Sequence, residues 1–312
     1  MAYSTRASGI PDNENSEHDA ITSVIKSATF IMRLRRNNLS MISLGFIILL
    51  ILVAIIGPFL TQSPTKIEMR RVENGQTIQP PFPPNPKNWF GTDQLGRDIF
   101  SRVLLGLRTS LIVGVIVRGF TMIAGIIIGL ISGYIGGSVD NVIMRITDIM
   151  LVFPPILLAM TITAVLGPGL FTVCVALVLV AWPDVARLVR GQVLYLKEEC
   201  YIEASKCLGA SKIRILFSHI LPNCLSLIIV SFSMGIPGAI MYEAGLSFFG
   251  FGIQPPSPSL GSIISDGRGY ITVAPWYPAF PGLVLALIVL SFNLLGDGLI
   301  DALNPRSTQK NK

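Results

Sequence analysis

The stretch that decides the fold is Met41–Leu60, M-I-S-L-G-F-I-I-L-L-I-L-V-A-I-I-G-P-F-L, which carries no charged side chain. A helix needs roughly 20 apolar residues to cross a hydrocarbon core about 30 Å thick, so this stretch predicts a membrane-spanning helix. Five further stretches qualify, approximately Thr109–Ser132, Ile149–Leu166, Leu170–Val189, Cys224–Phe248 and Ala279–Leu295. The sequence therefore predicts an all-α polytopic membrane protein with six transmembrane helices.

The composition supports the same fold class. Of 312 residues, 51% are hydrophobic and only 13% are charged, whereas soluble globular chains carry about 25% charged residues. So few charges cannot cover a water-facing surface, and a lipid bilayer is the expected surrounding. The net charge of +6 comes from basic residues in short segments between apolar stretches, which is typical of membrane proteins and argues against nucleic acid as a partner.

Basic residues beside the spans predict the orientation. Arg33, Arg35 and Arg36 precede the first span, and such residues favour the cytoplasmic side. An even number of spans returns the C-terminus to the same side, so we expect both termini in the cytoplasm. The segment between the first two spans is also basic and opposes this topology, but long loops follow the charge rule weakly.

The chain divides into four parts on this interpretation. We expect a cytoplasmic tail at 1–40, a first helix with an extracytoplasmic loop at 41–108, a five-helix core at 109–306 and a cytoplasmic tail at 307–312. Within the second part, Ile99–Leu107 is expected to form a short amphipathic helix at the membrane surface. The core contains a cytoplasmic loop at 191–222.

The most informative part of that loop is Glu198–Pro222, E-E-C-Y-I-E-A-S-K-C-L-G-A-S-K-I-R-I-L-F-S-H-I-L-P. We expect two short helices broken at Gly209, a capping role for Ser211, and Pro222 in the first turn of the next membrane helix. A solvated connector is the simpler interpretation. The apolar residues argue against it and indicate a protein partner; they are Ile202, Leu208, Ile213, Ile215, Leu216 and Phe217.

This segment resembles the EAA motif of ABC importer permeases. The matching residues are Glu203, Ala204, Ser205, Gly209, Ile220, Leu221 and Pro222, with His219 as a departure from the general pattern. The resemblance implies a type I ABC importer (MetI-like) permease fold, in which the motif docks on an ATP-binding subunit. By position, Glu203 would make a polar contact, Ala204 would pack closely and Gly209 would make the turn.

Three further motifs resemble the C-type peptide and nickel permeases. They are G-T-D-Q-L-G-R-D at Gly91–Asp98, E-A-G-L-S-F-F-G at Glu243–Gly250, and F-N-L-L-G-D-G-L at Phe292–Leu299. Leu260 and Asn304 depart from the usual pattern. The resemblance implies uptake of dipeptides, oligopeptides or nickel across the bacterial inner membrane. It also implies a heterodimer with a homologous permease, two ATP-binding subunits and an extracytoplasmic solute-binding protein.

No catalytic residue, metal site or cofactor is expected in this chain. The phosphate-binding pattern G-x-x-x-x-G-K-[ST] does not occur, so ATP and magnesium are expected in the partner subunits. The four cysteines have no metal-ligand spacing, and no hydrolase motif supports a membrane enzyme.

Charged residues inside spans are costly and often functional. Arg118 would either line a translocation path or pair with a neighbouring helix, and we favour pairing. Glu243 is interpreted as a packing or gating residue that could border the path, and Asp184 with Arg187 as a local ion pair. The alternative function is a self-contained transporter driven by an ion gradient. That class usually has internal repeats and facing intramembrane acids, and neither is evident here.

Overall fold

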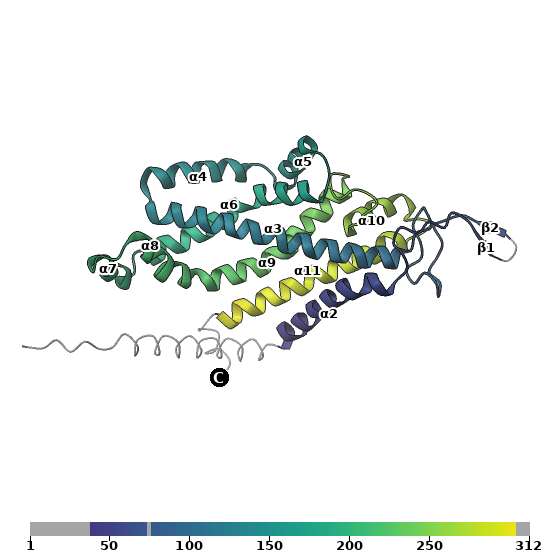
Figure 1. Cartoon of the computed structure of the whole chain (residues 1–312), viewed down its shortest axis with the longest axis horizontal. Helices are drawn as coiled ribbons and strands as arrows, with labels where there is room; N and C mark the ends of the chain where they lie inside the picture. The colour runs from purple at the N-terminus through teal and green to yellow at the C-terminus, as the bar shows by residue number, and fades with distance from the viewer. Residues whose placement is uncertain (1–37, 74–75, 304–312) are drawn as a thin grey trace, which may run out of the picture.

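The computed structural model describes residues 38–73 and 76–303 (Figure 1). The tails expected at 1–40 and 307–312 therefore lie almost entirely outside the described residues, as do the basic residues that flank the first and last spans. The described residues form an elongated bundle of helices. A polar loop lies at one end of the bundle and a segment of short helices lies at the other (Figure 1).

The helices that carry most of the predicted spans are α2 (Asn38–Leu60), α3 (Ile99–Ile135), α4 (Gly137–Val152), α5 (Pro155–Leu166), α6 (Leu170–Leu196), α9 (Leu221–Phe248) and α11 (Trp276–Leu303). They run along the bundle, except the shortest of them, α5, which lies at 90° to α4 (Figure 1). The shorter elements are β1 (Arg71–Glu73), β2 (Gln76–Ile78), α7 (Cys200–Cys207), α8 (Lys212–Arg214), the π-helical turn η1 (Ile215–Ile220), α10 (Leu260–Gly267) and the 3-10 turn η2 (Arg268–Tyr270).

The all-α polytopic fold predicted from the sequence is confirmed. Among the described residues, five helical segments are each long and apolar enough to cross a membrane, and the α4–α5 pair makes a sixth span if it is counted as one. The sixth is not the straight helix expected at Ile149–Leu166. The pair bends by 90° at Phe153, because Pro154 and Pro155 follow it and proline lacks the N–H that would continue the α4 ladder.

The prediction of a separate surface helix at Ile99–Leu107 is wrong. These residues are the first turns of α3, a continuous helix of 37 residues, and most of them are buried between α2, α10 and α11. The helix starts there because Asp98 accepts a hydrogen bond from the Ser101 backbone N–H at 2.8 Å, which supplies an N-cap.

Helices α3 and α6 pack closely along much of their length because glycines of α3 face α6. A Cβ at Gly125 would lie 2.5 Å from Val185, and one at Gly129 would lie 2.6 Å from the Ala186 carbonyl oxygen. Small residues at such spacing let two membrane helices approach until their backbones touch. This contact fixes the centre of the bundle.

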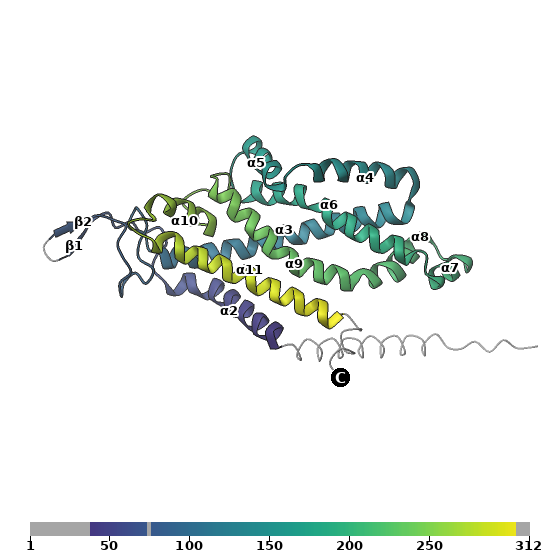
Figure 2. The same ribbon diagram turned by 180° about the vertical axis from the view of Figure 1, so that it is seen from behind.

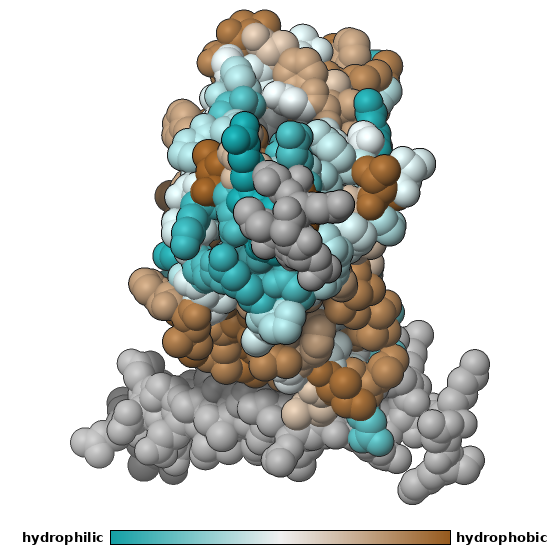
Figure 3. Space-filling model, turned by 90° about the vertical axis from the view of Figure 1, so that its right-hand side faces the viewer, coloured by the Kyte–Doolittle hydropathy of each residue, from teal (hydrophilic) through white to brown (hydrophobic). Residues whose placement is uncertain are grey.

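The bundle exposes apolar side chains along its sides. On α2 alone these include Ile42, Ile48, Leu49, Ile51, Leu52, Ile55 and Ile56. Seen from behind, α2 and α11 form one edge of the bundle (Figure 2). From the loop end, hydrophilic residues gather over the loop and apolar residues cover the flank (Figure 3). Lipid is therefore the surrounding that this surface requires.

A small antiparallel hairpin of β1 and β2, with Val72 opposite Thr77, projects from the loop. The sequence interpretation did not contain this hairpin.

Candidate coupling surface and transport cavity

The segment that follows α6 folds as two short helices separated by a turn at Gly209. The turn is closed by hydrogen bonds from the Gly209 N–H to the Lys206 carbonyl at 3.0 Å and from the Ala210 N–H to the Ser205 carbonyl at 3.1 Å. Gly209 has φ = +80°, the left-handed conformation that suits glycine at the end of a helix. The predicted break at Gly209 is confirmed.

The second short helix is continuous with the next membrane helix, which differs from the prediction. Ser211 caps it as expected, accepting from the Arg214 N–H. The chain then passes through η1 into α9, where Pro222 stands in the first turn. Pro222 has no N–H to donate to Ser218, which fits the wider π-helical turn at this point. The Asn223 side-chain amide donates to the His219 carbonyl at 2.6 Å in the same turn.

The apolar residues of this segment fall into two groups. Ile202, Ile215 and Ile220 are fully buried against the ends of α3 and α6 and anchor the segment. Leu208, Ile213 and Phe217 point outward, with 88%, 70% and 59% of their surface exposed.

Glu203 and Ala204 of the motif are exposed beside the outward-pointing group. We refer to these outward residues together as the coupling surface: Glu203, Ala204, Leu208, Ile213 and Phe217. Ser205, Leu221 and Pro222 instead serve the internal geometry: the Ser205 hydroxyl donates to the Tyr201 carbonyl at 2.8 Å, and the other two begin α9.

A cavity of about 170 Å³ lies between α3, α6, α9 and the bend of α4–α5, and it opens at the surface, where Asp184, Gly238 and Tyr242 are exposed. Arg118 of α3 lines it together with Asp184 of α6 and Tyr242 of α9. The Arg118 guanidinium also donates to the Ser231 carbonyl at 2.7 Å and to the Ser231 hydroxyl at 2.6 Å. Arg118 thus pairs with a neighbouring helix, as favoured, and borders a cavity as well.

Gly235 makes the position of Arg118 possible. A Cβ at Gly235 would overlap the Arg118 guanidinium, whereas a Cβ at Gly238, one turn further along the same helix, would meet nothing. The guanidinium therefore lies across the bare backbone of α9. The sequence did not indicate that Arg118 would lie against Gly235, because a glycine within an apolar span is common and does not point to a partner.

Glu243 is not among the residues that line this cavity. Its carboxylate is fully buried between α3 and α9. It accepts hydrogen bonds from the Ser110 hydroxyl at 3.1 Å and the Ser247 hydroxyl at 2.7 Å. A buried carboxylate that is hydrogen-bonded within the protein fixes the packing of its two helices. The geometry supports the packing interpretation and gives no support to a place on the path.

The predicted local pair of Asp184 with Arg187 is wrong. Arg187 instead forms an ion pair of 2.6 Å with Asp148 of α4, across two half-exposed side chains. Asp184 is left beside the cavity. Since a helix places residues three apart on one face only approximately, an acid on a packed neighbour can be the nearer partner.

The G-T-D-Q-L-G-R-D motif builds the opposite end of the molecule. Asp93 is fully buried and accepts from the Leu95 and Arg97 N–H groups at 2.9 Å and from the Arg97 guanidinium at 2.6 Å. It also pairs with Arg102 at 3.5 Å. Asp98 caps α3 and accepts from the Asn88 amide at 3.0 Å.

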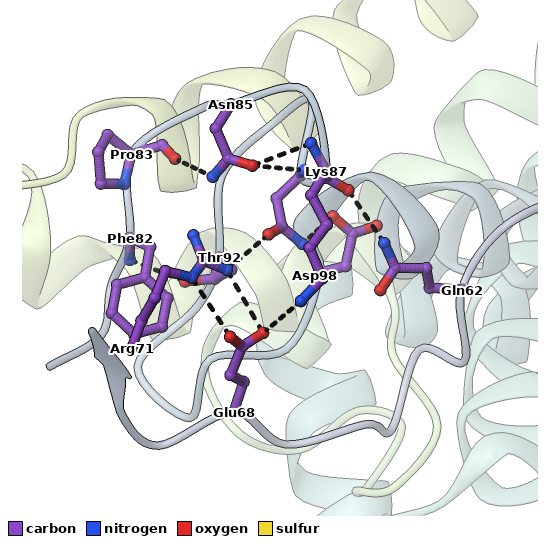
Figure 4. A network of polar contacts seen from close by, with 10 residues as sticks. Gln62, Glu68, Arg71, Phe82, Pro83, Asn85, Lys87, Thr92 and Asp98 are labelled. Carbon is purple, nitrogen blue, oxygen red and sulfur yellow. Dashed lines mark hydrogen bonds and ion pairs between the residues drawn. The ribbon is translucent and has the colours of Figure 1, made fainter. Parts of the chain in front are cut away.

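A second set of polar contacts surrounds this motif (Figure 4). Glu68 accepts from Arg71 at 3.3 Å and from Lys87 at 3.1 Å. The Phe82 N–H donates to the Thr92 hydroxyl at 2.8 Å. We use the name loop knot for the network of polar contacts that these two sets of residues form. The sequence analysis singled out the G-T-D-Q-L-G-R-D motif but did not predict its structural role. Among the described residues, no group of three or more His, Cys, Asp or Glu side chains is placed to hold a metal ion.

Comparison with known proteins agrees with this architecture. Residues 125–309 match the family model described as binding-protein-dependent transport system inner membrane component. Residues 28–81 match the N-terminal TM domain of oligopeptide transport permease C.

Curated relatives cover most of the chain. It is 43% identical to a dipeptide transport system permease protein DppC of Alkalihalophilus pseudofirmus, over 94% of each chain. It is 40% identical to the oligopeptide transport system permease protein OppC of Bacillus subtilis, over 88% of each. It is 42% identical to a glutathione transport system permease protein GsiD of Pectobacterium atrosepticum, over 89% of this chain and 90% of the relative.

A solved structure shows the same fold. An inward-facing form of the MetNI methionine ABC transporter aligns with a TM-score of 0.54 and 22% identity, covering 65% of this chain and 96% of that one. The architecture is therefore that of the membrane-spanning permease subunit of an ABC importer. The chain belongs to the binding-protein-dependent transport system inner membrane components, in the branch of the dipeptide and oligopeptide permeases.

Proposed function

We propose that this chain forms one half of a translocation pathway for peptides in the bacterial cytoplasmic membrane, with both termini in the cytoplasm. Its partners are a homologous permease, two ATP-binding subunits and an extracytoplasmic solute-binding protein. ATP with magnesium is bound and hydrolysed in the ATP-binding subunits, and this chain carries out no covalent chemistry. The relatives named for dipeptide, oligopeptide and glutathione transport support peptides as the cargo, and nickel is the alternative that the motifs also allow.

The observation that carries the proposal is the coupling surface. Three large apolar side chains stand exposed on a short segment that is itself anchored by three buried isoleucines. Exposed apolar side chains rimmed by polar groups mark protein interaction sites, and a rigid anchor lets a docked partner move the attached helices. Closure of the ATP-binding subunits would therefore pull α6 and α9 between two packings, as in other rigid-body switches.

The Arg118 cavity is the proposed path. It lies between helices that lead from the coupling surface into the bundle, and it places a guanidinium near the Asp184 carboxylate. Peptides carry a free carboxylate and a free ammonium, so both charges of the backbone would meet a complementary group along this wall. Glu243 stabilises the helix pair beside it.

The Gly209→Val variant tests the docking role. Valine has to adopt φ = +80° there, which costs about 1–3 kcal/mol locally, although a Cβ at Gly209 meets no neighbouring atom. We expect the variant to insert normally but to reduce uptake per ATP hydrolysed by the assembled transporter. Gly191→Val is the matched control, because a Cβ at that exposed glycine also meets nothing and its φ is not positive.

Two results would contradict the proposal. One is equal loss of coupling in both variants, since the turn would then have no special role. The other is solute movement by the purified chain alone in liposomes, which would favour an ion-driven transporter. Loading the vesicles with peptide or with nickel separates the two cargoes.

A further inference from the structure

A second cavity lies where α3 and α6 end, beside α7, α8 and η1, which we call together the coupling segment. It has a volume of about 370 Å³ and brings together three lysines from separate elements. We call it the lysine pocket; its walls include Lys197, Lys206, Lys212, Tyr134, Ile135 and Ile215. It lies on a different part of the segment from the outward-pointing side chains of the coupling surface, none of which lines it.

None of the three lysines forms an ion pair within the part of the chain that the structure describes, although Lys197 lies near enough to Asp140 for an electrostatic interaction. The Lys197 ammonium has a long contact of 3.4 Å with the Gly133 carbonyl. On neighbouring α4, the Asp140 carboxylate is already held by two hydrogen bonds of 2.6 Å from Arg190. Ammonium groups gathered around one cavity repel one another, so an anion placed among them would be stabilised by all three.

The surroundings of the pocket indicate where the anion comes from. Ile135 at its rim is exposed, and exposed apolar residues continue from there along α4 as Val139, Val142 and Ile146. Tyr134 adds an aromatic ring with a polar tip, a residue type enriched where a membrane meets water. The pocket therefore lies where a lipid-facing surface ends and a basic cluster begins.

We propose that the lysine pocket binds the phosphate group of an anionic phospholipid, whose acyl chains lie along the exposed apolar residues of α4. Basic pockets between membrane helices bind anionic headgroups in this manner. Occupancy would connect the ends of α3 and α6 to α7 and α8 through a shared anion. The lipid then stabilises the position of the coupling segment. The proposal depends on the proposed function only for assigning this end to the cytoplasm.

The test uses the full chain purified in neutral detergent. Dioctanoyl-phosphatidylglycerol and dioctanoyl-phosphatidylcholine are titrated separately, and binding is followed by native mass spectrometry. We expect a preference for the anionic lipid of about tenfold or more, decreasing as salt is raised. A triple variant, Lys197→Gln with Lys206→Gln and Lys212→Gln, should lose the preference.

The matched control removes the same charge at a distance from the pocket, by Lys66→Gln with Arg70→Gln and Arg108→Gln, and should keep the preference. Should the triple variant not fold, the single Lys206→Gln change and the salt dependence of the natural chain test the same point.

Three outcomes would overturn the proposal. The first is equal affinity for the two lipids in the natural chain. The second is full displacement of the lipid by an equal concentration of inorganic phosphate, which would make a soluble anion the ligand. The third is an unchanged lipid preference in the triple variant. Loss of the co-purifying ATP-binding subunit from that variant would then assign the lysines to a protein partner.

Discussion

The two ends of the molecule both carry a motif that the sequence singled out, but the motifs are used in opposite ways (Figure 1). In the loop knot, the charged residue of the motif is buried and surrounded by donors: Asp93 is fully enclosed and engages two arginines. In the coupling segment, the acid Glu203 and its apolar neighbours are exposed. A recognisable motif can therefore either stabilise its own chain or remain exposed for binding to a partner. The burial of its side chains distinguishes the two uses.

The largest effect is expected from Asp93→Ala in the loop knot. The change leaves Arg97 and Arg102 without the carboxylate that they share, and breaking a buried ion pair costs about 3–5 kcal/mol. We expect a strongly lowered thermal unfolding midpoint in detergent and a poor yield of monodisperse chain. Glu203→Ala at the other end is the matched control and should change stability by no more than about 0.5 kcal/mol. Equal stability of the two variants would remove the distinction between the ends.

The second prediction concerns binding rather than folding. Phe217→Ser removes an exposed aromatic ring from the coupling surface, and truncating such an anchor typically weakens an interface by about 2 kcal/mol, or roughly 30-fold. We expect less ATP-binding subunit to co-purify while the unfolding midpoint stays the same. Trp89→Ser, at an exposed aromatic residue of the loop end, should leave co-purification unchanged. If both serine variants retain the subunit equally, the coupling surface lies elsewhere.

The third prediction probes the centre of the bundle, between the two ends. In Gly235→Ala the new methyl group would overlap the Arg118 guanidinium and displace this flexible side chain. Losing its hydrogen bonds to Ser231 costs about 1.5–3 kcal/mol. Because Arg118 is forced away from Ser231, peptide uptake by the reconstituted transporter should fall. Gly238 lines the same cavity, but a Cβ at this position would have no neighbour within reach. The Gly238→Ala variant should therefore keep both stability and uptake. Full uptake by Gly235→Ala would exclude Arg118 from the path.

The sequence predicted those features that depend on composition along a single segment. Apolar runs such as Met41–Leu60 had to be spans, and Gly209 had to end a short helix. It failed where two segments meet. The burial of Ile99, for example, depends on α10 and α11 covering it. The 90° bend at Phe153, by contrast, follows from two prolines that the sequence already contains.

The candidate site shows the same division. Composition indicated that the segment up to Pro222 needed a partner, but it could not separate the buried Ile202 from the exposed Leu208. That choice depends on which helix face α6 and α3 cover. In the same way, Arg118 can reach Ser231 only because Gly235 has no side chain. A single glycine in an apolar span is not a sequence pattern that predicts this contact.

The smallest expected effect is a pH-dependent change in the stability of the loop knot. The hydrogen bond from Arg71 lowers the pKa of Glu68 below its usual 4.5, Lys87 adds to this effect, and partial burial opposes it. Because the folded-state pKa is below the unfolded one, this stabilisation is present at neutral pH and is lost as the pH falls through the folded pKa. For a partly exposed pair it amounts to less than about 1 kcal/mol. The unfolding midpoint of the natural chain should therefore fall slightly further than that of Glu68→Gln between pH 7 and pH 4. Identical decreases would mean that the ion pairs of Glu68 contribute as little to stability as the exposed charges of the coupling end.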